Sequence, residues 1–140
     1  MKVKLHRVNN NVHFRAFNGE GPTIDIDGSP AIGGEGQGFR PMETVLAAHA
    51  GCTVMDLVPI LEKQRQRVDD VRVGIDGTRG EGNPSPFTAI HIHYDLEGQI
   101  EVEKARKALD LAVYKYCSVG EMLKHSATIT YSFTVNGVAG

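Results

Sequence analysis

Residues 41–68 read PMETVLAAHAGCTVMDLVPILEKQRQRV, and this stretch decides the fold. It predicts one long helix, because Pro41 suits the first helical position, Glu43 places an acid in the first turn, and basic residues gather near the far end. From Val45 to Leu61 the helix is apolar on almost every side, which is typical of a helix buried all round. We therefore expect the rest of the chain to cover this helix.

A stripe of polar residues interrupts the apolar pattern of the helix. Its members lie three and four positions apart, so they share one face: His49, Cys52, Thr53 and Asp56. Small residues flank Cys52, which allows other backbone to approach it closely. A thiol at the centre of such a stripe is the chemical feature that needs an explanation.

Length and composition set limits on the class of protein. The 140 residues are enough for a single domain, 1–140, with a core of its own. A formal net charge of −2 gives no reason to expect nucleic acid or an anionic membrane as a partner. The basic start of the chain is followed by no apolar run, so we expect no signal peptide and a cytoplasmic protein. Two cysteines in that compartment are more often free, redox-active or metal-bound than a permanent disulfide.

The remaining elements follow from hydrophobic periodicity. The patterns predict three N-terminal strands at residues 3–5, 12–16 and 23–27, and two strands after the long helix at 71–75 and 90–96. They then predict a second helix at 101–116, a short third helix just past 117 and a final strand at 128–135. The short helix would begin with the capping box of residues 118–121. This order predicts an α+β fold with two small antiparallel sheets around long central helices. Since so few strands cannot cover a helix that is apolar all round, we expect an intertwined homodimer.

Residues 28–40 hold five glycines and few side chains that could pack. A glycine-rich loop before a helix could cradle a phosphate. Neither the Lys-Ser/Thr pair of a P-loop nor the dinucleotide-binding spacing is present, so we favour a mobile rim over a pocket and expect no cofactor.

The two cysteines are the main candidates for chemistry. An unpaired cysteine in a helix usually acts as a small buried hydrophobic residue, and Cys52 by itself would be interpreted in that way. Cys117, however, lies where one helix ends and another begins, so free N–H groups could stabilise its thiolate. Such a pair can alternate between dithiol and disulfide, with Cys52 oxidised to a sulfenic acid and Cys117 condensing with it.

A buried thiol needs a positive partner, because burial raises the pKa of a thiol. A protonated His49, one turn before Cys52, could supply that charge, as could Arg15, Arg40 or Arg79. Glu43 could orient such an arginine. Its alternative role is to stabilise the positive end of the helix dipole.

His91 and His93 lie two apart in a predicted strand and share one face, as two metal ligands would. No third ligand follows at a matching spacing, so we expect solvent-facing histidines and no metal site.

The cysteine motifs resemble those of the OsmC/Ohr family of thiol-dependent peroxidases. The resemblance rests on residues 41–43 leading into LAAHAGC at 46–52, on Asp56, and on YCSV at 116–119. Residues 61–63, 66–68 and 115–119 are most similar to a less characterised OsmC-like branch. The order of predicted elements agrees along nearly the whole chain.

The resemblance implies an obligate α+β homodimer with Cys52 as the peroxidatic thiol and Cys117 as the resolving thiol. It also implies an arginine beside the reactive cysteine, held by a glutamate. Glu43 matches the glutamate motif, and Arg15 is our first choice for the arginine.

We therefore predict a thiol-dependent peroxidase that reduces small apolar organic hydroperoxides and is regenerated by an external dithiol or lipoyl carrier. The alternatives are a non-catalytic dimer that binds a small apolar ligand and a redox sensor that uses the same cysteines.

Overall fold

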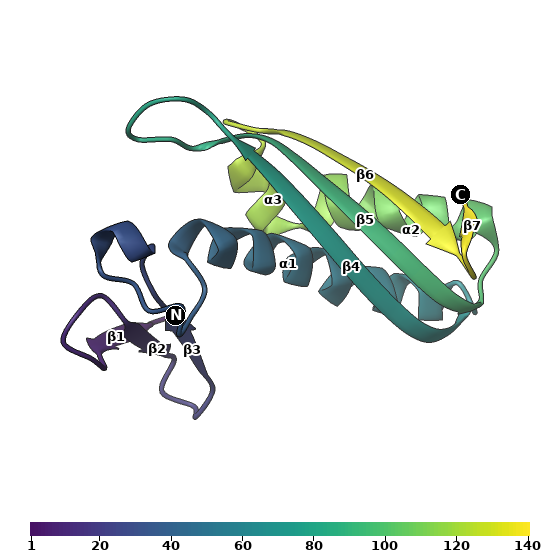
Figure 1. Ribbon diagram of the computed structural model, residues 1–140. Coiled ribbons are helices and arrows are strands. Elements are labelled where there is room, and N and C mark those ends of the chain that lie inside the picture. Colours follow the sequence, from purple (N-terminus) through teal and green to yellow (C-terminus); the bar gives the residue numbers. More distant parts are fainter. The chain divides into compact units, whose positions relative to one another are not determined.

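The computed structural model describes residues 1–140, and the chain divides into two compact units, Met1–Val45 and Leu46–Gly140 (Figure 1). The fold is of the mixed α+β class that the sequence predicts, with one small sheet in each unit. The organisation as one domain stays a prediction.

The first unit contains a three-stranded antiparallel meander, as predicted. Its strands are β1 (Lys4–Arg7), β2 (Phe14–Phe17) and β3 (Thr23–Ile26), paired in the order β1-β2-β3. A short 3₁₀ helix, η1 (Pro30–Ile32), lies in the glycine-rich loop that follows.

The buried carboxylate of Asp27 organises this glycine-rich loop. It accepts hydrogen bonds from the backbone N–H groups of Gly28, Glu35 and Gln37 at 2.8–3.1 Å. Burial alone would raise the pKa of Asp27, but these three bonds outweigh it and hold the pKa below its ordinary value. Gly34 must be a glycine, because a Cβ there would lie 1.7 Å from the carbonyl oxygen of Gly28. The amides that could have cradled a phosphate therefore bind an internal carboxylate instead.

The long helix predicted from residue 41 is present as α1 (Pro41–Lys63), and it continues through Pro59. It ends before the predicted position at Val68. Arg65 adopts a left-handed conformation (φ 60°), while the N–H of Gln66 donates to the carbonyl of Leu61 and closes the helix with a Schellman-type cap. The sequence gives no clear signal for this helix end, because the residue in the left-handed conformation is an arginine, whereas glycine is usual there.

The second unit contains a four-stranded sheet. Its strands are β4 (Arg67–Arg79), β5 (Phe87–Gln99), β6 (Thr128–Val135) and β7 (Val138–Ala139), in that order. β5 and β6 are joined by α2 (Val102–Leu111), the π-helical turn η2 (Ala112–Tyr116) and α3 (Ser118–Leu123).

The expectation that both sheets are antiparallel is wrong for one strand pair. β4 and β5 are antiparallel, but β5 and β6 run parallel. The helical connection carries the chain back to the end where β5 begins, and such a crossover produces a parallel pair. The hairpin to β7 was also missed, although Asn136-Gly137, both with positive φ, is a strong turn signal.

The core of the second unit lies between its sheet and its helices. Alternate side chains of β5 are fully buried, together with side chains of α1 and α2: Ile90, Ile92, Tyr94, Leu96, Leu57, Leu61, Ala105, Ala108 and Leu109. Alternation along β5 follows the period of two of a strand with one covered face. The helices thus lie against one face of the sheet (Figure 1), and the alternate, more exposed positions of β5 on the other face include His91, His93 and Asp95.

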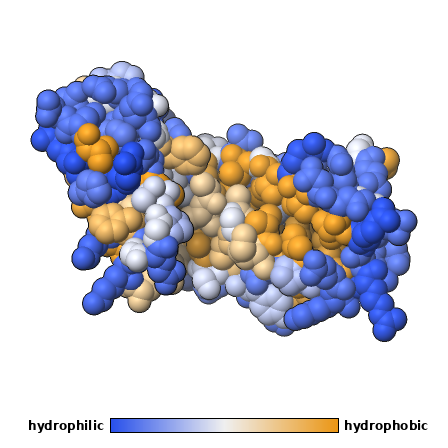
Figure 2. Space-filling view, turned by 90° about the horizontal axis from the view of Figure 1, so that it is seen from below, coloured by the Kyte–Doolittle hydropathy of each residue, from blue (hydrophilic) through white to orange (hydrophobic).

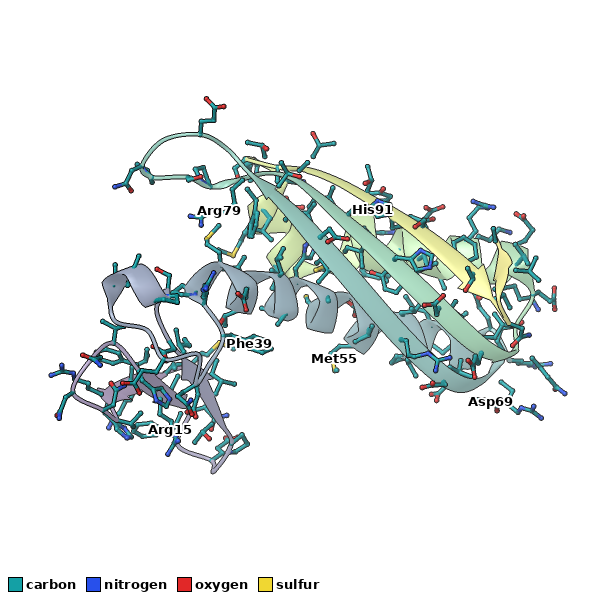
Figure 3. The ribbon with its side chains drawn as sticks, viewed as in Figure 1. Arg15, Phe39, Met55, Asp69, Arg79 and His91 are labelled. Atoms are coloured by element: carbon teal, nitrogen blue, oxygen red, sulfur yellow. The ribbon has the colours of Figure 1, made fainter.

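The other side of α1 is left uncovered. Met55 is 73% exposed and points away from the sheet (Figure 3). α1 has the length and hydropathy of a membrane-crossing helix, a test that core helices of globular proteins also pass. Here it carries the polar stripe and buries Leu57 and Leu61 against its own sheet, as the core helix of a soluble fold does.

Candidate active site

The two cysteines meet in the second unit, although they come from distant parts of the sequence. Cys52 lies in the middle of α1, and Cys117 lies between η2 and α3. Both are free thiols, and Cys52 lies near enough to Cys117 to raise the pKa of the Cys117 thiol. The structure therefore brings together the pair that could exchange between dithiol and disulfide.

Cys117 is the N-cap of α3. Its Sγ accepts a hydrogen bond from the backbone N–H of Gly120 at 3.1 Å. The predicted start of the helix is right, but the predicted capping residue, Ser118, is already inside the helix. A sulfur therefore takes the position that a serine or aspartate oxygen usually fills.

The environment of Cys117 keeps it protonated at neutral pH. Burial raises its pKa to about 11, and the neighbouring Cys52 thiol adds to the increase. The N–H groups of Gly120 and Val119 act in the opposite direction, because they stabilise the thiolate. Cys117 is 4% exposed, whereas Cys52 is only half-buried. Of the two sulfurs, Cys52 is the one that a substrate from solvent can reach.

His49 lies on the buried side of the same site. Its side chain is fully buried, and neither ring nitrogen has a hydrogen-bond partner. A Cβ at Gly120 would lie 3.1 Å from His49 Nε2 and 3.4 Å from Cys117 Sγ. The glycine therefore allows α3 to approach both the imidazole and the thiol.

Burial lowers the pKa of His49 below its ordinary value of 6.5, so its imidazole is neutral at neutral pH. The expectation that a protonated His49 supplies positive charge to Cys52 is wrong.

Thr53 and Tyr94 fasten α1 to the sheet next to the thiols. The Tyr94 hydroxyl donates to Thr53 Oγ1 at 2.7 Å, and Thr53 Oγ1 donates to the carbonyl of Ala50 at 2.8 Å. Both side chains are fully buried, and burial raises the pKa of Tyr94 to about 12. This pair satisfies its polar groups internally and fixes the rotation of α1 beneath Cys52.

The remaining predicted site residues belong to the first unit. Arg15, on β2, forms a two-bond ion pair with Asp25 on β3: Nε–Oδ1 is 2.7 Å and Nη2–Oδ2 is 3.1 Å (Figure 3). This pairing raises the pKa of Arg15 and lowers that of Asp25, mainly through the hydrogen bonds between them. Glu43 is exposed in the first turn of α1. The roles of Arg15 and Glu43 stay predictions.

Of the other two arginines that we considered, Arg40 is exposed just before α1. Arg79, at the end of β4, donates from Nε to the carbonyl of Ser85 at 2.8 Å (Figure 3).

Sequence reasoning missed three residues, one in the first unit and two in the second. Asp25 could have been suspected, because it faces Arg15 across a predicted meander. Tyr94 lies on the buried face of a predicted strand, where a tyrosine needs a partner for its hydroxyl. Nothing in the sequence indicated that Gly120 matters, because it allows the close approach only once α3 packs against α1.

Comparison with known proteins now places the chain in a family. The family model described as OsmC-like protein matches residues 34–132. The chain belongs to the OsmC-like family. The resemblance seen in the sequence is thereby confirmed.

Relatives and solved structures agree with this assignment. Protein YhfA of Escherichia coli strain K12 is 42% identical over 96 residues, which cover 68% of this chain and 72% of the relative. The crystal structure of a hypothetical protein from Aquifex aeolicus VF5 is 30% identical, covers 96% of both chains and superposes with a TM-score of 0.80. The structure of an organic hydroperoxide resistance protein OsmC from Legionella pneumophila covers 96% of both chains at 18% identity, with a TM-score of 0.71, and shares the fold.

The buried His49 predicts a pH dependence of stability. Its pKa is lowered in the folded state, so as pH falls below about 6.5 the unfolded chain takes up a proton that the folded chain does not. The free energy of unfolding should therefore fall through this residue as the pH drops below about 6.5. Urea unfolding of the parent protein and of His49→Leu at several pH values, at fixed protein concentration, measures the difference.

We expect His49→Leu to flatten the pH profile relative to the parent. The exposed His125→Gln variant controls for loss of a histidine as such. Equal acid sensitivity in His49→Leu and the parent would contradict the description of His49 as a buried neutral imidazole.

Proposed function

We propose that this OsmC-like protein is a thiol-dependent peroxidase that reduces organic hydroperoxides, with Cys52 as the peroxidatic and Cys117 as the resolving thiol. The observation that supports the proposal is that two free thiols of unequal exposure are neighbours in the second unit. The half-buried Cys52 is accessible to a substrate, whereas Cys117 is enclosed and can react only with a group that forms beside it.

The reaction proceeds in three balanced steps. The Cys52 thiolate attacks the outer peroxide oxygen, the O–O bond breaks, and the alkoxide takes a proton to leave as an alcohol, so that Cys52 becomes a sulfenic acid. Cys117 then forms a bond to the Cys52 sulfur, the S–O bond breaks, and the hydroxide leaves as water with the Cys117 proton. An external dithiol or lipoyl carrier reduces the disulfide by thiol exchange and is itself oxidised.

The two thiols suit these roles in different ways. Because its pKa is about 11, Cys117 stays protonated and does not compete for the peroxide, since the thiolate is the nucleophile. The N–H of Gly120 stabilises the thiolate of Cys117 when its proton leaves. Resolution is thus confined to the moment when a sulfenic acid is present on Cys52.

Cys52 needs a positive partner in its thiolate form, and His49 is neutral. We retain Arg15 as the first choice, with Glu43 as the residue that orients it. The ion pair with Asp25 holds the Arg15 guanidinium on the first sheet, so Asp25 joins Glu43 as an orienting residue in this proposal.

The substrate class is supported by the fold and by the names of structural neighbours. The Legionella structure and one from Elizabethkingia anophelis are both named organic hydroperoxide resistance proteins. The apolar residues of α1 around Cys52 also favour a small apolar hydroperoxide over hydrogen peroxide. We propose a cytoplasmic location, where dithiol reductants are available.

We further propose that the protein is a homodimer. An apolar hollow of about 480 Å³ opens on the uncovered side of α1 and along β4, lined by Val54, Met55, Val58, Pro59, Val71 and Val73. Figure 2 shows hydrophobic side chains gathered on this side of the molecule. A contiguous apolar surface of this kind is usually covered by a partner, and a second copy of α1 would match it in chemistry.

Substitution of each cysteine tests the peroxidase proposal. Cys52→Ser should lower kcat/KM for cumene hydroperoxide by roughly a thousandfold or more, because the nucleophile is lost. Cys117→Ser should lose turnover with the dithiol but accumulate a sulfenic acid on Cys52 that dimedone traps. Turnover is measured by consumption of hydroperoxide with dihydrolipoamide present, and trapping by mass spectrometry.

The matched control is Ser118→Ala, which changes the residue next to Cys117 and leaves both thiols in place. Full turnover by both cysteine variants would refute the peroxidase proposal. Oxidation of Cys52 without turnover by the parent protein would favour a redox sensor.

A charged residue on the uncovered side of α1 tests the homodimer. Met55→Glu should shift the protein to monomer in sedimentation velocity, because a carboxylate would be buried without a partner. The control is Met122→Glu, at a methionine of similar exposure on α3, 77% against 73%. A Met55→Glu protein that remains dimeric, or a parent protein that is monomeric at micromolar concentration, would contradict the proposed interface.

A further inference from the structure

The outer face of the second sheet carries an unbroken chain of hydrogen-bonded side chains that the proposed function does not use. It runs along β5 and β6 through six residues, Thr130, His91, Ser132, His93, Asp95 and Thr134. The strand register places each β5 residue beside one β6 residue: His91 beside Thr130, His93 beside Ser132, and Asp95 beside Thr134.

Two histidine nitrogens point at one atom in this chain. His93 Nδ1 lies 2.7 Å and His91 Nε2 lies 2.9 Å from Ser132 Oγ. The sequence placed the two histidines on one face, and the structure adds the hydroxyl from the neighbouring strand.

The outer nitrogens of both rings also have partners. His93 Nε2 lies 3.2 Å from Asp95 Oδ1, and His91 Nδ1 lies 2.8 Å from Thr130 Oγ1. Asp95 Oδ1 also accepts a hydrogen bond from Thr134 Oγ1 at 2.7 Å. Without a cation, each side chain can donate a hydrogen bond to the next, from Thr130 through His91, Ser132 and His93 to Asp95. Every ring nitrogen in the chain then has a partner.

A second assignment of the same protons prepares both inner nitrogens for a metal ion. In it, His93 Nε2–H donates to Asp95 and His91 Nδ1–H donates to Thr130, which leaves lone pairs on His93 Nδ1 and His91 Nε2. A carboxylate behind a ligating histidine is the usual second shell of a metal site, because it fixes the tautomer and raises the basicity of the ring. Only a tautomer change at His91 and rotation of the Ser132 and Thr130 hydroxyls separate the two assignments.

We propose that His91 and His93, with the Ser132 hydroxyl between them, bind one divalent transition-metal ion of the Cu²⁺, Ni²⁺ or Zn²⁺ type on the outer face of the sheet. Imidazole nitrogen selects these ions over Mg²⁺ and Ca²⁺. Metal–nitrogen bonds of about 2.0–2.1 Å are shorter than the 2.7 and 2.9 Å that separate the two nitrogens from Ser132 Oγ, so an ion between them requires both rings and the Ser132 side chain to shift. No group of three His, Cys, Asp or Glu side chains converges in the molecule, so water completes the coordination.

The position suits binding from solvent. The His93 and Asp95 side chains are 41% and 48% exposed, and His91 is exposed as well (Figure 3). Both histidines lie on a long strand paired on both sides, which holds their Cα positions firmly. The site faces away from the buried side of β5.

Titration with Cu²⁺ tests the proposal on the full chain with both cysteines replaced by serine, since thiols also bind these ions. Isothermal titration calorimetry near neutral pH should give one ion per chain. Electron paramagnetic resonance should show coupling to two imidazole nitrogens. His91→Gln and His93→Gln should each weaken binding at least tenfold, and Asp95→Ala should weaken it roughly 10–100-fold.

His125→Gln is the matched control, because it removes an exposed histidine outside the chain of hydrogen bonds, and it should bind like the parent. Binding that is equally tight in His91→Gln and His93→Gln, or no saturable binding up to millimolar Cu²⁺, would overturn the proposal. Circular dichroism of each variant checks that its sheet is intact. Because the readout is binding without turnover, the result is independent of the peroxidase proposal.

Discussion

The hydrogen bond from the Gly120 N–H to Cys117 Sγ is the interaction on which the site depends. It makes the sulfur the cap of a helix, so the position of the thiol is fixed by the start of α3 and not by a free rotamer. The crossover of α2, η2 and α3, which also makes β5 and β6 parallel, carries this cap to the side of α1 that holds Cys52. A connection between two strands therefore decides which thiols can react with each other.

α1 meets two demands on its opposite sides. One side buries His49, Thr53 and Leu57 against the rest of the second unit, and the other leaves Met55 in solvent. Cys52 is half-buried, at the boundary between the two sides. The proposed function uses this position, because it gives the same sulfur an enclosed thiol nearby and access for a substrate. Within the second unit the price of this arrangement is a histidine without hydrogen-bond partners, which costs stability of the order of 1–3 kcal/mol per unsatisfied group.

Much of the fold could be predicted from the sequence, because the signals were local. The meander, the start of α1, the start of α3 and the bounds of β6 all follow from periodicity and capping. The parallel direction of β6 relative to β5 could not be predicted, since it depends on the path of the helical connection between the two strands. The predicted end of α1 was too late, because Arg65 adopts a left-handed conformation that is uncommon for an arginine.

The candidate site was predictable in its residue types but not in its charges. Cysteine spacing and the family resemblance singled out Cys52 and Cys117, which are neighbours in the structure, and their roles stay predictions. The charge of His49 could not be foreseen, because it depends on how completely α3 and the sheet exclude water from the ring. The partner of Arg15 likewise depends on strand register, which pairs it with Asp25.

The most direct test of this account is to locate the bond that one equivalent of organic hydroperoxide creates. Peptide mass spectrometry of the oxidised, unreduced protein reads it without any assumption about the reductant. The account predicts a single disulfide between Cys52 and Cys117 of the same chain, formed in proportion to the alcohol released. Thiols that both remain reduced, or disulfides that form only between chains, would contradict it.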